Sequence, residues 1–486
     1  MYKDVPRHRV TEQIRRQDLV HFASLITVER IAQAASATGL AIIKSPLSLP
    51  YLVWLALGLA LSPSTNFSHI LTAILQALED HASFPSTPVG KARGSSRRAR
   101  QKQSARPRSK HSPKKNDPTT TPSEEAFVQA RQRVPLVFWQ NLMVILADAF
   151  QQQHQERLSF KQFRVLAMDG TRMSLPHWKR LAQHYGRARN QRAYSYPQAR
   201  LVMMQFPFTR FPYRYELATL RDSELRVGQR LLPSLQPNDL LLLDAGFWSF
   251  SFFADVAERD AFFAIRLRAD IKNLKTLVRY DDHEKLARLT YSGRTKKFLQ
   301  VGSLDVRLLT YRIPGFRKQT IVTNQLDRQA MSFDDWTCLG RLDDQQRLVQ
   351  GLYSRRWEIE TTFRELKVTQ SMAGHLRSRT PASLQFEIAG HILLYALTRW
   401  LMTNAAVQKH LDPLQLSFKH CLELLLQMRE RLLLASTAWQ AVLLQRLLER
   451  MTSLLVTPRP GRRFLRRKRS SNHRKKKCHT KSKQEA

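Results

Sequence analysis

Nine residues, Asp239-Leu240-Leu241-Leu242-Leu243-Asp244-Ala245-Gly246-Phe247, carry the strongest structural signal in the chain. Four successive leucines between polar ends predict a short strand that is covered on both faces, as in a sheet with parallel strands. The segment Arg164-Val165-Leu166-Ala167-Met168-Asp169-Gly170 has the same character, because a buried strand pattern ends in an aspartate and a turn. We therefore predict an α/β fold in which two neighbouring strands each end in an aspartate.

The composition indicates a polyanionic partner. The chain has 486 residues, with 79 Lys+Arg against 39 Asp+Glu and a formal net charge of +40, so nucleic acid is the expected partner. A basic peripheral membrane protein is the alternative, but the longest clean apolar run, 51–61, is much shorter than the roughly 20 residues that span a bilayer. We expect no membrane partner and read this run as a core helix.

The cysteines and the first residues indicate the compartment. Cys338, Cys421 and Cys478 are widely spaced, so a disulfide framework and a zinc finger are both excluded. The first residues lack the apolar core of a secretion signal. We expect a protein of a reducing compartment, the cytoplasm.

Two patches concentrate the positive charge. Residues 91–115 contain 11 Lys/Arg and no acid, and residues 459–486 contain 13 Lys/Arg and one Glu. Removing both contributions from the net charge leaves +17, so the remainder is itself basic. We interpret the patches as attracting phosphates, which is independent of sequence and weakened by salt. The alternative is a pair of disordered extensions that only keep the protein soluble.

The segment from Tyr353 to Lys367 carries a polar face. In an α-helix, Tyr353, Arg356, Glu360 and Lys367 fall within a sector of about 60°. The neighbouring apolar stripe would pack this helix on the sheet and leave the polar stripe at the edge of the contact. The alternative is an ordinary amphipathic helix with an Arg356–Glu360 ion pair.

Three acidic residues are the predicted catalytic and metal-binding groups. The strand ends would bring Asp169 and Asp244 into one crevice, and the helix would add Glu360. Clustered carboxylates repel one another unless cations bind, so the expected cofactor is a pair of Mg²⁺ ions, with Mn²⁺ as a substitute. Two ions about 3.5–4 Å apart support in-line attack on a phosphodiester. Arg356 and Lys367 would hold phosphates, and the Tyr353 hydroxyl would bond to a phosphate oxygen.

These motifs resemble a known family. The spacing Tyr353-x2-Arg356-x3-Glu360-x6-Lys367, together with Asp169-Gly170-Thr171 and Asp244-Ala245-Gly246-Phe247, is similar to the signature of the insertion-sequence-four family of DDE transposases. The segment 27–61 also resembles the helical N-terminal domain of that family. The resemblance implies an RNase H-like catalytic core with a β-rich insertion before the glutamate helix.

The resemblance further implies a reaction and its partners. A homodimer would act on double-stranded DNA, cutting one strand at terminal inverted repeats and then joining the freed 3′ ends to target DNA. Related enzymes that form a DNA hairpin use an aromatic wedge to flip a base, and Trp336 is a candidate for this role, although a tryptophan there is commonly a core residue. Two alternatives remain: a catalytically silent DNA-binding regulator or relic, and an RNase H-like nuclease without strand transfer.

Seven consecutive parts follow from these patterns. They are a helical N-terminal domain with a DNA-binding role (1–90), a basic disordered linker (91–122), the first part of the core (123–271), the β-rich insertion (272–331), the glutamate helix (332–372), a helical C-terminal region (373–458) and a basic disordered tail (459–486).

Deletion of residues 459–486 tests the role of the tail. We expect weaker binding to every DNA sequence by about the same factor, since binding to phosphates carries no base information. The salt dependence of binding should also fall, by a slope of about 0.9 for each phosphate that the shortened chain no longer binds. Fluorescence anisotropy at several salt concentrations, with repeat and unrelated duplexes, measures both effects. A loss confined to one sequence would contradict this role.

Overall fold

The computed structural model describes most of the predicted core. The described residues are 25–40, 48–61, 124–188, 196–291, 302–312, 317–337, 351–434 and 437–457. The basic linker, the basic tail and much of the predicted N-terminal domain lie outside them. The boundaries of the seven parts stay predictions.

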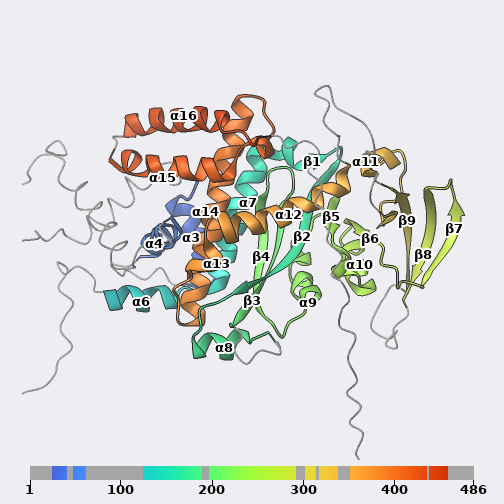
Figure 1. Cartoon of the computed structure of the whole chain (residues 1–486), viewed down its shortest axis with the longest axis horizontal. Helices are drawn as coiled ribbons and strands as arrows, with labels where there is room; N and C mark the ends of the chain where they lie inside the picture. The colour runs from blue at the N-terminus through green and yellow to red at the C-terminus, as the bar shows by residue number, and fades with distance from the viewer. Residues whose placement is uncertain are drawn as a thin grey trace, which may run out of the picture.

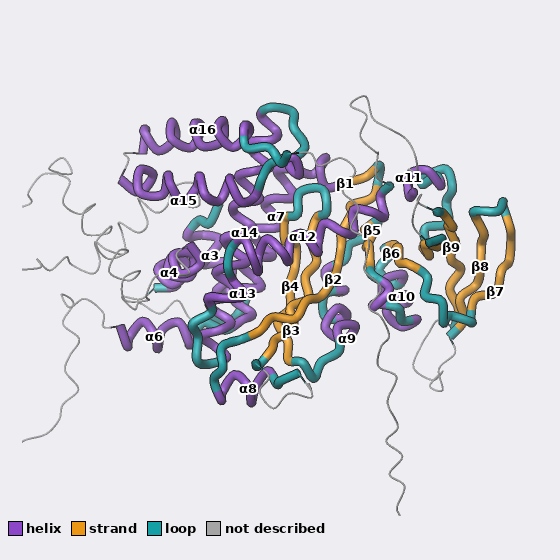
Figure 2. The backbone as a smooth tube through the Cα atoms, viewed as in Figure 1, coloured by secondary structure: helices purple, strands orange, loops and turns teal. Residues whose placement is uncertain are grey.

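A large mixed sheet forms the centre of the described chain (Figures 1 and 2). Its ten strands are β1 (Ser159–Phe160), β2 (Phe163–Ser174), β3 (Gln198–Phe206), β4 (Phe211–Thr219), β5 (Asp239–Leu243), β6 (Phe262–Arg266), β7 (Leu274–Arg279), β8 (Glu284–Thr290), β9 (Ser303–Tyr311) and β10 (Gln319–Thr323). The spatial order is β4-β3-β2-β5-β6-β10-β9-β8-β7, with β1 paired to β2. The β2–β5 and β5–β6 pairs are parallel and all other pairs are antiparallel. The predicted α/β class is confirmed as a mixed α/β fold.

Strand β5 lies in the middle of this sheet. All five of its residues are buried, which confirms the prediction of a strand covered on both faces. Because side chains alternate along a strand, Leu240 and Leu242 face one layer and Leu241 and Leu243 face the other. The first pair packs in a cluster with Trp336 and Tyr353.

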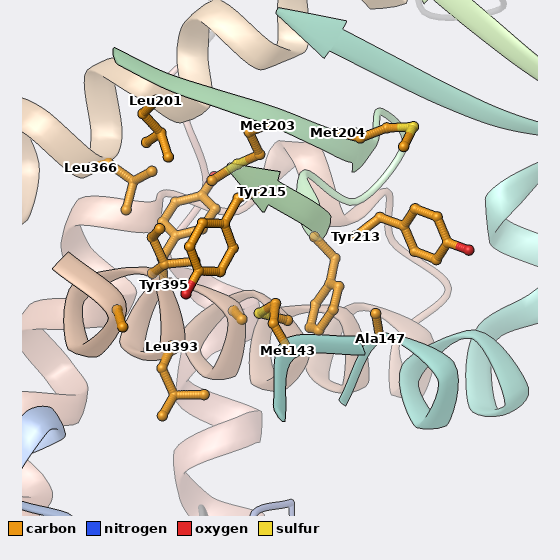
Figure 3. Packing of buried hydrophobic residues seen from close by; sticks show 14 of the residues in the cluster. Met143, Ala147, Leu201, Met203, Met204, Tyr213, Tyr215, Leu366, Leu393 and Tyr395 are labelled. Atoms are coloured by element: carbon orange, nitrogen blue, oxygen red, sulfur yellow. The ribbon is translucent and has the colours of Figure 1, made fainter. Parts of the chain in front are cut away.

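Helices cover both faces of the sheet. On one face lie α9 (Glu224–Gln229) and α10 (Phe250–Ala257), with the short turns η1 (Leu232–Ser234) and η2 (Ala245–Phe247). The other face packs against α7 (Leu136–Leu158), α12 (Glu358–Arg364) and α14 (Pro381–Gln408). Figure 3 shows this second interface, where Met203 and Tyr215 of the sheet approach Leu366 and Tyr395 from the helices.

The predicted β-rich insertion continues the same sheet. Strand β10 pairs antiparallel with β6, and β9, β8 and β7 follow outward to the edge. The chain therefore returns to the core through hydrogen-bonded strands and not through a loop alone. A short helix, α11 (Phe333–Thr337), follows the last of these strands.

Two helical segments are interrupted. Helix α6 (Glu124–Arg133) ends before α7, because Pro135 disfavours helical geometry in the residue before it. The predicted glutamate helix is described from 351 onward, where it changes type twice. It consists of the 3₁₀ turn η4 (Leu352–Trp357), then α12, then the π-helical turn η5 (Glu365–Thr369).

The remaining elements are α3 (Val28–Ser36), α4 (Leu49–Leu61), α8 (Lys179–Tyr185), α13 (Met372–His375), η6 (Pro413–Gln415), α15 (Phe418–Leu434) and α16 (Thr437–Ser453). Most of them pack around α14, whereas α3 packs on α7 and α13 on η5. Among the described residues, no single helix is long and apolar enough to cross a membrane. The bent pair α6–α7 reaches the required length and composition only when its two helices are joined, and the inner side chains of α7 are buried in the core.

Replacing Gly390 with Ala tests the close approach of α14 to α4. A Cβ at Gly390 would overlap with the Ala56 carbonyl oxygen, so the two helices must separate. We expect a loss of about 1–3 kcal/mol in the free energy of unfolding. The control is Gly374→Ala, because a Cβ there has no neighbour within 4 Å among the described residues. Urea unfolding compares both variants with the parent, and equal stability of all three would contradict the packing.

Candidate active site

Two aspartates lie at matching positions on paired strands. Met168 of β2 is the register partner of Leu243 of β5, and Asp169 and Asp244 come directly after these residues. Alternation along the strands places both carboxylates on the face of Ala167 and Leu242, which is the face covered by η4. The predicted convergence of the two strand ends is therefore present in the structure.

Glu360 reaches this face from α12. Its Oε1 atom accepts a hydrogen bond of 2.7 Å from Nη1 of Arg356, one helical turn earlier. The other carboxylate oxygen, Oε2, is buried and has no hydrogen-bond partner among the described residues. Such an unpaired buried oxygen is costly unless a cation or donor reaches it.

The electrostatics link each of the three acids to Arg356. Burial and the negative charges of Glu360 and Glu224 raise the pKa of Asp169 to about 7, against the opposing effects of the Gly170 N–H and Arg356. Burial would lower the pKa of Arg356, but the charges of Glu360, Tyr353 and Asp244 raise it. The Arg356 guanidinium thus lies within electrostatic range of all three acids. Asp244 also lies 4.0 Å from Nη2 of Arg266.

The chemistry of these described side chains suits a metal ion, whereas their spacing in this structure does not. Carboxylate oxygens are the ligands that Mg²⁺ prefers, and a bound cation would compensate both the buried free oxygen of Glu360 and the raised pKa of Asp169. In the part of the chain that the structure describes, no group of three His, Cys, Asp or Glu side chains is close enough to hold a metal ion. The roles of Asp169, Asp244 and Glu360 as catalytic groups and ligands stay predictions.

Two predicted DNA contacts need correction. The Tyr353 side chain is buried, and its hydroxyl donates a hydrogen bond of 2.9 Å to the Leu243 carbonyl, so it positions η4 on β5 and does not face a phosphate. Trp336 is 1% exposed and packs in the core cluster on the sheet, so it cannot act as a base-flipping wedge in this arrangement. The alternative of a core tryptophan holds.

Lys367 contacts the sheet from η5. Its Nζ donates to Oγ1 of Thr171 and, at 2.7 Å, to the carbonyl oxygen of Arg172. Partial burial lowers its pKa. Lys367 and Arg356 therefore lie near the aspartate strand, and their binding to DNA phosphates stays a prediction.

A buried polar network beside Glu360 was not predicted. Glu365 accepts hydrogen bonds from Arg399 and, at 2.8 Å, from the Tyr395 hydroxyl, and it pairs at 3.0 Å with Arg210. Although burial acts in the opposite direction, the two arginines lower the pKa of Glu365. Arg210 also pairs with Glu358 at 2.6 Å. One sequence signal points to this network: Arg399 is a charged residue inside a long apolar helix.

Comparison with known families agrees with this geometry. The family model described as "Transposase DDE domain" matches residues 161–397, which include Asp169, Asp244 and Glu360. Residues 161–397 are similar to a transposase DDE domain. The matched region spans the whole sheet except β1 and ends within α14.

Two individual proteins are also similar to this chain. The transposase InsG for insertion sequence element IS4 of Escherichia coli (strain K12) is 29% identical over 242 residues, which are 48% of this chain and 51% of the relative. The chain spans about half the length of this curated relative. A cryo-EM structure of the piggyBac transposase synaptic complex with hairpin DNA aligns with 95% of this chain and 90% of its own chain, at 11% identity and a TM-score of 0.36.

The raised pKa of Asp169 predicts how stability depends on pH. The folded protein holds this proton up to about pH 7, whereas an unfolded aspartate loses it near pH 4. Between these values the folded state binds more protons, so this residue makes stability fall as the pH rises. Asp169→Asn should remove the dependence and raise the free energy of unfolding at pH 7.5 by roughly 2–4 kcal/mol.

Urea unfolding at pH 5 and pH 7.5, without divalent ions, measures this effect. The control is Asp282→Asn, an 83% exposed side chain in the turn between β7 and β8. A parallel pH profile for the parent and Asp169→Asn would contradict the raised pKa of Asp169.

Proposed function

We propose that this protein is the DDE transposase of an insertion sequence. It cuts DNA at terminal inverted repeats and joins the 3′ ends to target DNA. The observation that supports this most directly is the placement of Asp169 and Asp244 after paired residues of parallel strands, with Glu360 in electrostatic range, inside the region that is similar to a transposase DDE domain.

The strand order supports an RNase H-like core. Taken in chain order from β2, the first five strands lie in the order 3-2-1-4-5, with three antiparallel strands followed by two parallel to the first. The glutamate helix crosses the face of this sheet on which the aspartates lie. This arrangement is the one that the resemblance to DDE transposases led us to expect.

Carboxylate oxygens of Asp169, Asp244 and Glu360 would hold the divalent cofactor, two Mg²⁺ ions with Mn²⁺ as a substitute. When bound, the cofactor polarises the scissile phosphate and stabilises the charge that develops on the leaving oxygen. The side chains of this chain supply the rest. Arg356 holds Glu360 and presents a cation at the reaction site, while Tyr353 fixes the start of this segment on β5.

The reaction that we propose has two balanced steps. In the first, the oxygen of water bonds to phosphorus, the bond from phosphorus to the 3′ oxygen breaks, and the proton of water ends on that oxygen. In the second, the freed 3′-hydroxyl bonds to a target phosphorus, and the leaving 3′ oxygen of the target takes the proton. We place this reaction in a homodimer bound to both element ends, in the bacterial cytoplasm at the nucleoid.

Substitution of Glu360 with Gln tests the assignment. We expect Mg²⁺-dependent nicking of an element end to fall by at least about 10²-fold, because the reaction loses a charged ligand, while DNA binding is retained. The matched control is Glu358→Gln on the same helix, since Glu358 pairs with Arg210 and does not serve as a ligand. The control should lower the melting temperature but keep nicking within about tenfold of the parent.

Products with a pre-cleaved element end separate the alternatives. Joined products indicate a transposase, cuts without joining indicate a nuclease, and binding without cuts in Mg²⁺ or Mn²⁺ indicates a regulator or relic. Nicking by Glu360→Gln at the parental rate would contradict the catalytic assignment.

A further inference from the structure

A cationic surface lies at the far end of β2, the strand that carries Asp169. It is formed by the end of β2, the start of α8 and the loop before α14, which lie together in the lower part of Figure 1. We call it the Trp178 surface and define it by Arg172, Trp178, Lys179, Arg180, Tyr196 and Arg379. All six of these side chains are exposed.

The cations of this surface have no acidic partners in the described part of the chain. The segment 171–188 contains no Asp or Glu, and none of Arg172, Lys179, Arg180 and Arg379 forms an ion pair with a described carboxylate. Exposed arginines elsewhere do, as Arg268 pairs with Asp270 and Arg288 with Asp305. An uncompensated group of cations attracts a polyanion.

Exposed aromatic rings lie among these cations. Trp178 is 41% exposed and Tyr196 is 62% exposed, although large aromatic side chains are usually buried. The guanidinium of Arg379 lies 4.6 Å from the centre of the Trp178 ring and covers one of its faces. The rings of Tyr196 and His177, the residue before Trp178, form an edge-to-face pair with their centres 5.8 Å apart. Cations interleaved with open aromatic rings form a platform on which bases stack.

The surface is continuous with the site of the acids. Lys367 of η5 bonds to Thr171 and to the carbonyl of Arg172, so one cation bridges the two regions. Asp169 and Arg172 are three residues apart on β2, roughly 10 Å along the strand. Their side chains point to opposite faces, so the link between the two regions runs through Thr171, on the face of Asp169, and Lys367. A DNA strand that leaves the acids along β2 would therefore reach the Trp178 surface within a few nucleotides.

We infer that the Trp178 surface binds an unpaired DNA segment next to the point of strand cleavage. This inference rests on the proposed function for the location of the cleavage point. Unpaired bases are the ligand that fits, because a duplex hides the faces of its bases and would use only the cations. Stacking on aromatic side chains tolerates every base, so the surface holds the strand without reading its sequence.

Binding measurements on the full chain in EDTA test this inference without any chemistry. The probes are a duplex of about 20 base pairs with an unpaired extension of about six nucleotides, and its blunt counterpart. Trp178→Ala should weaken binding of the extended probe about tenfold and change the blunt probe less than about twofold. Trp178→Phe keeps a stacking ring and should restore most of the affinity.

The charge of the surface has its own variant and control. The double variant Lys179→Ala, Arg180→Ala should weaken binding of the extended probe. The slope of the logarithm of its binding constant against the logarithm of salt concentration should fall in magnitude by about 1.4, because two phosphates of a single strand are no longer neutralised. Arg288→Ala is the matched control, because it removes an exposed arginine that is already paired with Asp305. This control should change neither probe by more than about twofold.

Melting temperatures detect a folding defect. Because Trp178 is exposed, its variants should melt at the same temperature as the parent. Equal binding of the extended probe by Trp178→Ala and the parent would overturn the inference, and so would an equal loss for both probes. Because no cleavage occurs in EDTA, these results are independent of the nicking assay with Glu360→Gln. Failure of the proposed reaction and failure of the Trp178 surface are therefore distinguishable.

Discussion

A buried carboxylate must be paired, and this constraint fixes the segment that carries Glu360. Glu365 is 8% exposed and is held by Arg399, Arg210 and the Tyr395 hydroxyl. Loss of one partner from such a buried group typically costs about 3–5 kcal/mol, so α12 cannot slide along α14 without a large penalty. At the other end, the bond from Tyr353 to the Leu243 carbonyl ties η4 to the strand that precedes Asp244. Glu360 therefore lies between two fixed points, one on the sheet and one on the helical layer.

The changes of helix type between these points have a geometric result. A 3₁₀ turn repeats every three residues, so Tyr353 and Arg356 lie on the same side of η4, and both reach the face of the aspartates. The π turn of η5 is wider than an α turn and shifts the side chains that follow it. Within this turn, Glu365 points to the helical layer while Lys367 reaches β2. The sequence pattern predicts a single straight α-helix instead. In such a helix the directions of Tyr353, Arg356, Glu365 and Lys367 would all follow one repeat of 3.6 residues per turn.

Local sequence patterns predict the central strands of the sheet, because a buried strand has a recognisable pattern within a few residues. The leucines of β5 and the aspartates after β2 and β5 are signals of this kind, and the parallel register then brings Asp169 and Asp244 together. The partners of single side chains could not be predicted, since they come from distant parts of the chain. The hydroxyl of Tyr353 and the ring of Trp336 had several conceivable environments, and only the packed structure shows that both are buried. The network around Glu365 joins residues 210, 358, 365, 395 and 399, a set that no local pattern connects.

The outer strands share an uninterrupted ladder with the strands of the acids. Strand β10 is hydrogen-bonded to β6, which is bonded to β5, and β9, β8 and β7 continue the series to the edge. The segment 267–273 is thus not the sole mechanical link between the insertion and the core. Shear applied to the β7–β8 hairpin would load many hydrogen bonds at the same time. Bonds loaded together share the force, whereas bonds loaded in sequence break one after another. The insertion is therefore a stiff extension of the core sheet, and a load on its outer strands would pass through β10 and β6 to the strand that precedes Asp244.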